Sequence, residues 1–129
     1  MAAVWTLTDV ERAVRASWGA DTCDPVDRLD WRPDNPARGQ CGVTALVLHD
    51  LFGGELVLGE VHVEGERTGA HYWNRFGAGL EVDLTRGQFR QGEEVVGGRT
   101  LQRPDGPPRR CREEYDLLRE RVLAHLAAT

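Results

Sequence analysis

Apolar residues recur at helical spacing near the start of the chain and predict a first helix with one buried face. Thr8 and Glu11 form a capping box at its start, in which each side chain satisfies an unpaired backbone N–H. Gly19 supplies a residue suited to the left-handed turn that ends a helix. The residues that we expect to face the core are spaced three or four apart: Val10, Ala13, Val14 and Trp18.

Two later segments also have the length of helices. Residues 41–52 are apolar on nearly all sides, which is typical of a helix buried at the centre of a fold, and two glycines end it. Cys41 therefore lies at or just before the N-terminus of that helix. Residues 112–127 are apolar on one face only, so they predict a C-terminal helix that packs back on the core. Three prolines within residues 21–40 predict an ordered loop there.

Strand patterns occupy the middle of the chain. Residues 55–64 alternate apolar and polar positions, and the alternation breaks near Gly59 as a β-bulge would break it. Residues 70–76 and 80–85 flank Gly77, Ala78 and Gly79, so they predict a β-hairpin, and residues 85–89 predict a short helical turn. Residues 90–110 are rich in glycine, proline and charge and predict mostly loop, extended only at 94–96 and 100–101. Both a lid and a disordered loop remain open for that segment.

These elements predict an α+β fold in which a central helix that carries Cys41 packs on a small antiparallel sheet, with the first and last helices outside it. The 129 residues are 40% hydrophobic and 29% charged, which suits one globular domain over residues 1–129. We find no internal repeat and no linker between domains.

Charge and cysteine content narrow the function. A net charge of −5 argues against electrostatic binding to the phosphates of a nucleic acid. All 16 basic residues are arginine, which excludes catalysis through a lysine Schiff base. The chain has no apolar run long enough for a signal peptide or a membrane span, so we expect a cytoplasmic protein with no membrane partner. The three cysteines have wide, unlike spacings, which predict free thiols and no disulfide framework.

Cys41 is the best candidate for a nucleophile. A helix N-terminus favours the thiolate over the thiol, and its unpaired backbone N–H groups can hold an oxyanion. The amide of Gln40 is a candidate for a further oxyanion donor, and a hydrogen bond within the loop is its alternative role. Cys23 and Cys111 have no base near them in the sequence, and we interpret both as unreactive.

The hairpin supplies a candidate base and its partner. A three-residue loop over 77–79 places Trp73 opposite Asp83, so His71 is the diagonal neighbour of Asp83 on the same face. Diagonal neighbours are about 7–8 Å apart at the backbone, a gap that an imidazole and a carboxylate can bridge. Asp83 is therefore expected to orient His71. An even number of residues in the loop would place the two side chains on opposite faces.

The residues around these three resemble the YunG-like family: Gly39–Ala45, His71–Asn74 and Glu81–Thr85. The order of a helix-borne Cys followed by His and Asp on adjacent strands also resembles the papain-like and transglutaminase-like superfamily of cysteine enzymes. The resemblance spans roughly residues 31–89 and implies an enzyme fold, but no particular substrate.

The sequence thus predicts a cysteine-dependent acyl-transfer enzyme with Cys41 as nucleophile, His71 as base and Asp83 as orienting acid. Its substrate is expected to be a small-molecule or peptide amide or thioester, and the acyl group passes to water or to an amine without a cofactor. Trp31, Trp73 and Asn74 are candidates for the substrate cleft, with packing of the core or loop as their alternative.

Two alternatives compete with this prediction. One is a binding module that keeps the superfamily fold without catalysis and recognises a partner through the region of Trp31 and Trp73. The other is a zinc site built from Cys41, His62 and His71, which lacks the close ligand pairs typical of such sites. We therefore predict no metal.

Overall fold

The computed structural model describes residues 4–128. Its three α-helices are α1 (Leu7–Ser17), α2 (Cys41–Phe52) and α3 (Arg112–Ala127). Its strands are β1 (Glu55–Val63), β2 (Glu66–Phe76), β3 (Leu80–Val82) and β4 (Glu93–Leu101), and three 3₁₀ turns join them: η1 (Pro25–Asp30), η2 (Gly77–Gly79) and η3 (Arg86–Gln88). The fold is α+β, as predicted.

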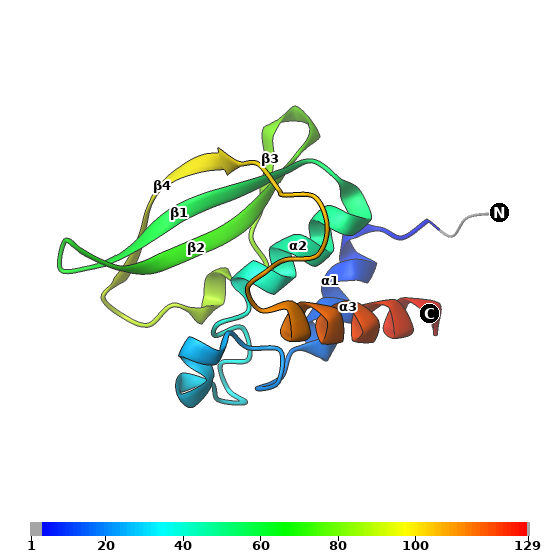
Figure 1. The fold of residues 1–129 in the computed structure, drawn as a ribbon, viewed down its shortest axis with the longest axis horizontal. Coiled ribbons are helices and arrows are strands. Elements are labelled where there is room, and N and C mark those ends of the chain that lie inside the picture. Colours follow the sequence, from blue (N-terminus) through cyan, green and yellow to red (C-terminus); the bar gives the residue numbers. More distant parts are fainter. Residues whose placement is uncertain (1–3, 129) are drawn as a thin grey trace.

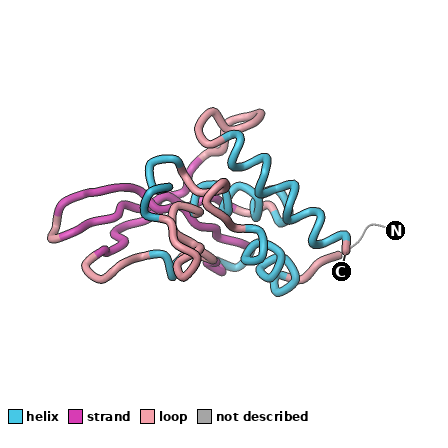
Figure 2. Tube along the Cα trace, turned by 90° about the horizontal axis from the view of Figure 1, so that it is seen from below, coloured by secondary structure: helices cyan, strands magenta, loops and turns pink. Residues whose placement is uncertain are grey.

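All four strands form one antiparallel sheet in the order β3-β2-β1-β4. α2 packs against the sheet, mainly on β2, and α1 and α3 pack against each other on the far side of α2 (Figure 1). The β1–β2 hairpin extends away from the helices (Figure 2). Because α2 has the sheet on one side and helices on the other, a sequence that is apolar nearly all round suits it, and Val43, Val47 and Leu48 are buried.

The start of α1 differs from the prediction. The N-cap is Thr6, whose Oγ1 accepts from the Asp9 backbone N–H at 3.1 Å, while the Thr6 N–H donates to the Asp9 carboxylate at 3.0 Å. Thr8 and Glu11 therefore lie inside the helix and form no capping box, because an equivalent threonine and acid pair occurs two residues earlier. The helix also ends without a left-handed glycine, since its C-cap is Trp18 in an extended conformation.

The largest difference lies in residues 90–110, which the composition assigned mostly to loop. Residues 93–101 form β4, which pairs along β1 from Val63↔Glu93 to Leu56↔Leu101. An edge strand with both faces exposed needs no alternation of apolar and polar residues. The polar sequence of β4 therefore gave no strand pattern. The predicted bulge is present, because the register with β4 shifts between Leu58 and Glu60.

The remaining elements follow the prediction closely. β2 begins earlier than expected, at Glu66, and β3 ends earlier, at Val82. The helical turn after β3 is η3, and the loop before α2 contains η1. Within residues 4–128, no helix is both long and apolar enough to cross a membrane.

Candidate active site

Cys41 is the first residue of α2. Its N-cap, Gln40, makes no side-chain hydrogen bond to the helix, so the first backbone N–H groups of α2 have no capping side chain. Cys41 is partly exposed, and its neighbour Gly42 lies beside the ring of Tyr72. These N–H groups and the helix dipole favour negative charge at this end of α2. They can stabilise a thiolate on the sulfur, and also an oxyanion on a carbon to which the sulfur has bonded.

His71 and Asp83 come together across the β2–β3 hairpin. Phe76 pairs with Leu80, as the three-residue loop predicted, and β3 ends at Val82, one residue before Asp83. His71 Nε2 donates to Asp83 Oδ2 at 2.6 Å, since a carboxylate only accepts. The Asp83 carboxylate accepts a further hydrogen bond from the Thr85 hydroxyl at 3.3 Å, which fixes its orientation.

Aromatic rings hold the imidazole in place. Trp73 stacks on His71 with ring centroids 5.5 Å apart, and Phe89 meets it edge-on at 4.7 Å. The His71 side chain is fully buried, while Asp83 keeps some contact with solvent. The ring therefore has one orientation, in which Nε2 is committed to Asp83.

The other ring nitrogen has no conventional partner. Among the described residues, Nδ1 of His71 is buried and makes no hydrogen bond. Burial by itself lowers the pKa of His71, but Asp83 and the nearby Cys41 thiol outweigh it and raise the pKa to about 9. Cys41 thus lies close enough to act on the ring, yet outside standard hydrogen-bond geometry to Nδ1.

The other two cysteines are in different surroundings. Burial raises the pKa of Cys23 to about 12, and the thiol contacts the Arg38 carbonyl oxygen at 3.2 Å. Burial likewise raises the pKa of Cys111 to about 11, where the charge of Asp24 adds to the effect. Both groups are held as thiols at neutral pH, so neither is suited to nucleophilic attack.

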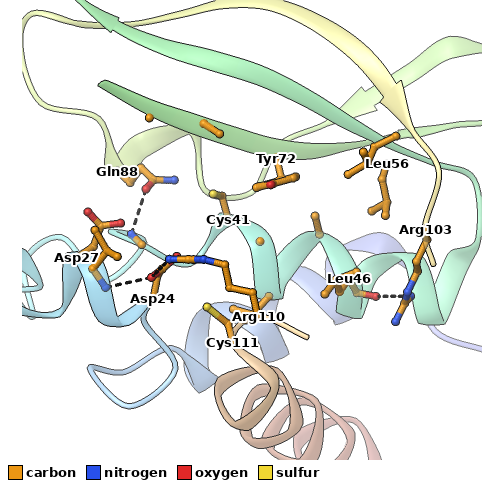
Figure 3. A pocket seen from close by; sticks show the side chains of 18 of the residues that line it. Asp24, Asp27, Cys41, Leu46, Leu56, Tyr72, Gln88, Arg103, Arg110 and Cys111 are labelled. Atoms are coloured by element: carbon orange, nitrogen blue, oxygen red, sulfur yellow. Dashed lines mark hydrogen bonds and ion pairs between the residues drawn. The ribbon is translucent and has the colours of Figure 1, made fainter. Parts of the chain in front are cut away.

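A cavity of about 490 Å³ lies beside Cys41. Its lining is mostly apolar, with charged groups of the η1 loop and of residues 103–110 around it (Figure 3). Cys41 lines this cavity, whereas His71 and Asp83 do not. The apolar part of the lining includes Val43, Ala45, Leu46, Leu56, Tyr72 and Leu101.

Comparison with known proteins places the chain by sequence. A family model described as "YunG protein" matches residues 6–127. The chain belongs to this family. A Bacillus subtilis (strain 168) protein described as "Uncharacterized protein YunG" is 38% identical over 83 residues, which make up 64% of this chain and 63% of that protein. No solved structure matches the chain.

Gln40 has a structural position in this YunG-family chain. Its side chain is fully buried, its Nε2 donates to the Gly19 carbonyl oxygen at 2.9 Å, and its Oε1 accepts from Thr22 at 2.8 Å. The amide thus anchors the loop after α1 and is turned toward that loop. Of its two predicted roles, the structure favours the loop hydrogen bond over the oxyanion donor.

The three residues predicted for the substrate cleft do not line the cavity. Trp31 donates from its indole to the Pro36 carbonyl oxygen at 3.0 Å and so fixes its own loop. Trp73 packs on His71 and over Gly59, where a Cβ would lie 2.8 Å from the indole. Asn74 is buried and donates to the Ala45 carbonyl oxygen at 3.0 Å, which ties β2 to α2. Their positions are those of packing residues.

Gln88 is a site residue that the sequence did not reveal. It is buried in η3, accepts from the Gly39 backbone N–H at 3.1 Å, and donates to the Thr85 carbonyl oxygen at 3.1 Å. It therefore connects the segment before Cys41 to the segment after Asp83. Its contacts join loops far apart in the chain, so no local pattern could have indicated it.

The residues of the zinc alternative are not gathered into a metal site. His62 hydrogen-bonds to Glu60 on its own strand at 2.9 Å. Over residues 4–128, no group of three or more His, Cys, Asp or Glu side chains is arranged to hold a metal ion.

Proposed function

We propose that this protein is a cysteine-dependent acyl-transfer enzyme of papain-like or transglutaminase-like type, with Cys41 as nucleophile, His71 as its proton partner and Asp83 as the orienting acid. The observation that carries the proposal is the buried His71. One of its nitrogens is fixed by Asp83 at 2.6 Å, and the other is left without a hydrogen bond beside the Cys41 thiol. A buried polar atom without a partner is costly in a purely structural histidine.

The raised pKa of His71 determines how the pair would work. A pKa of about 9 keeps the imidazole protonated at neutral pH. In the proposed mechanism the Cys41 sulfur attacks as the thiolate beside this imidazolium. The thiolate attacks the carbonyl carbon of an amide or thioester. The carbonyl oxygen gains the negative charge, which the free N–H groups at the start of α2 stabilise.

Collapse of this intermediate breaks the bond to the leaving group, which takes the Nδ1 proton of His71 and departs as an amine or thiol. Cys41 then carries the acyl group as a thioester. Neutral His71 removes a proton from water or from an amine as it attacks the thioester carbon. The products are an acid or a new amide, and the thiolate and imidazolium are restored.

The first test is cysteine labelling with iodoacetamide at different pH values, followed residue by residue by mass spectrometry. We expect Cys41 to label well below the pH at which a free thiol reacts, and Cys111 to serve as the internal control. His71→Gln and Asp83→Asn should each slow labelling of Cys41 by about tenfold or more and leave Cys111 unchanged. Circular dichroism confirms that each variant is folded.

A second measurement separates catalysis from mere reactivity. Acid quenching during turnover of an activated ester or thioester should trap an acyl group on Cys41, detectable as added mass that Cys41→Ser lacks. If Cys41 labels no faster than Cys111 and ignores both substitutions, the triad is wrong. The alternative of a non-catalytic binding module would then be the better account.

A further inference from the structure

Four charged residues line the cavity beside the candidate nucleophile, and three of them are committed to ion pairs. Arg103 donates to Asp50 at 2.7 Å, and Arg110 donates to the two carboxylate oxygens of Asp24 at 2.7 and 3.0 Å. The fourth is Asp27, whose carboxylate makes no hydrogen bond to any of the described residues. Asp27 is therefore the charged group of the lining that is left to meet a ligand.

Arg38 is the cation that faces Asp27, but another acid holds it. Its guanidinium donates two hydrogen bonds to Glu93, at 2.8 and 3.3 Å, whereas its distance to the Asp27 carboxylate is 3.9 Å. That distance is too long for a hydrogen bond. Burial raises the pKa of the Asp27 carboxyl, Arg38 opposes this rise, and three nearby acids add to it. The negative charge of Asp27 is thus incompletely balanced within the protein.

Gly39 places Asp27 close to the start of α2. A Cβ added at Gly39, where φ is +72°, would lie 2.9 Å from the Asp27 Cβ and 2.5 Å from the Cys23 sulfur. The close packing of Asp27 on this backbone therefore depends on the missing side chain. Because Gly39 is two residues before Cys41, Asp27 lies at the N-terminal side of the sulfur, and Figure 3 shows Leu46 on the other side.

The cavity beyond Cys41 offers apolar contact. Along α2 its lining includes Val43 and Leu46, and within the described lining no other charged side chain lacks a hydrogen-bonded partner. A carboxylate at the border of an apolar cavity attracts a cation more strongly than a carboxylate in water, because the local dielectric is lower. The molecule that complements this cavity therefore has a positive charge near Asp27 and an apolar remainder.

We propose that the substrate of this site carries a positively charged ammonium group, which forms an ion pair with Asp27 while the reacting carbonyl carbon lies at Cys41. This inference rests on the proposed function and specifies the class of amide or thioester. The ammonium group belongs either to the acyl group, which stays on the sulfur, or to the leaving group. No bond or proton changes at Asp27, so it is a binding residue and takes no part in the acyl transfer itself.

The test uses two sets of thioesters, with a trimethylammonium group on the acyl chain in one set and on the leaving thiol in the other. Each has a tert-butyl counterpart of the same shape without charge. Mass spectrometry follows the rate at which the acyl group is added to Cys41 of the full chain, divided by the rate with a small free thiol. In one set or both, the charged thioester should react about fivefold faster or more than its neutral counterpart. Equal rates within both sets would overturn the proposal.

Two variants that remove one negative charge from the same turn assign the preference to Asp27. Asp27→Asn keeps the shape of the side chain, so the preference should fall below about twofold while the neutral thioesters keep nearly the wild-type rate. Asp30→Asn is the matched control, because Asp30 lies outside the lining and pairs with Arg90 at 3.5 Å. It should keep the preference, and it accounts for the attraction that a net charge of −5 exerts on any cation.

Three results with these variants would contradict the assignment. They are a preference that survives in Asp27→Asn, an equal fall in both variants, and a loss in Asp27→Asn of the charged and neutral rates alike. The last would show that Asp27 supports the structure of the site and does not bind the cation. The set of thioesters in which the preference depends on Asp27 identifies the part of the substrate that carries the charge.

Labelling with iodoacetamide, which is uncharged, distinguishes the two levels of failure. If Cys41 is selectively reactive and depends on His71, but the thioesters show no effect of charge, the inference about the substrate fails and the acyl-transfer proposal stands. If Cys41 is not selectively reactive even toward iodoacetamide, the proposed function itself fails.

Discussion

The charge of His71 is set by its two neighbours, and Asp83 is the one that can be changed without touching the nucleophile. Burial lowers the pKa of the imidazole, whereas Asp83 and Cys41 raise it to about 9. Asn has nearly the shape of Asp but no charge. In Asp83→Asn we therefore expect the pKa of His71 to fall by about one unit or more, which imidazole ¹⁵N chemical shifts recorded over roughly pH 5 to 10 would measure.

Glu81→Gln is the matched control for this titration. Glu81 lies two residues before Asp83, but its carboxylate binds Arg75 and Trp73 on the surface, so its loss should leave His71 unaffected. A wild-type His71 that titrates near 6.5, or an equal response to both substitutions, would contradict the assignment of Asp83.

The three central residues of the site were predictable because each depends on local rules. Cys41 follows from the start of an apolar helix, and the pairing of His71 with Asp83 follows from the number of residues in a tight turn. The loop-binding role of Gln40 was one of two predicted for it, but its partners were not predictable, and Gln88 was not predicted at all, because amide side chains bind whichever loop packs next to them. Here Gln40 binds the loop after α1, and Gln88 binds Gly39.

At the scale of an element, the start of α1 gives a direct comparison between two threonines. Thr6 caps the helix through Asp9, whereas Thr8 is exposed inside its first turn. Thr6→Ala should lower the free energy of unfolding by about 1 kcal/mol, and Thr8→Ala should change it by no more than a few tenths. Urea denaturation of both variants measures the difference, and a larger loss in Thr8→Ala would place the cap where the sequence alone suggested it.

The strands differ in how well the sequence predicts them. β1 was predictable, bulge included, because it is central and its apolar residues must meet the core. β4 is an edge strand whose residues are nearly all exposed, so its sequence is free to carry glycine and charge. β4 is placed by its backbone pairing with β1, and residues 93–101 themselves carry no pattern that indicates this pairing.

At the scale of the molecule, the site exists because three separate contacts fix α2 against its surroundings. Trp18 of the loop after α1 donates to Thr44 at 2.9 Å, Asn74 of β2 donates to the Ala45 carbonyl oxygen, and Arg103 after β4 donates to the Leu46 carbonyl oxygen. Each contact joins residues at least 26 positions apart in the chain. The sequence could predict the helix that carries Cys41, but not these contacts, which hold the first half of that helix against Trp18, β2 and the segment after β4.

The buried charge also links the stability of the whole molecule to pH. An ordinary histidine titrates at 6.5, and His71 in the folded chain at about 9, so the folded state binds the proton more tightly. The resulting stabilisation is fully present below about pH 6.5 and is lost as pH rises through about 9.

In the proposed pair Cys41 gives up a proton while His71 holds one, so the folded pair binds one proton, as do the thiol and neutral imidazole of the unfolded chain. We therefore expect the free energy of unfolding of the wild type, relative to that of His71→Gln, to stay nearly level between about pH 6.5 and 8.5. Urea denaturation across this range measures the slope. A stability difference that falls steadily over this range would show that His71 gains its proton without a matching loss from Cys41, and the thiolate and imidazolium pair would lose its physical basis.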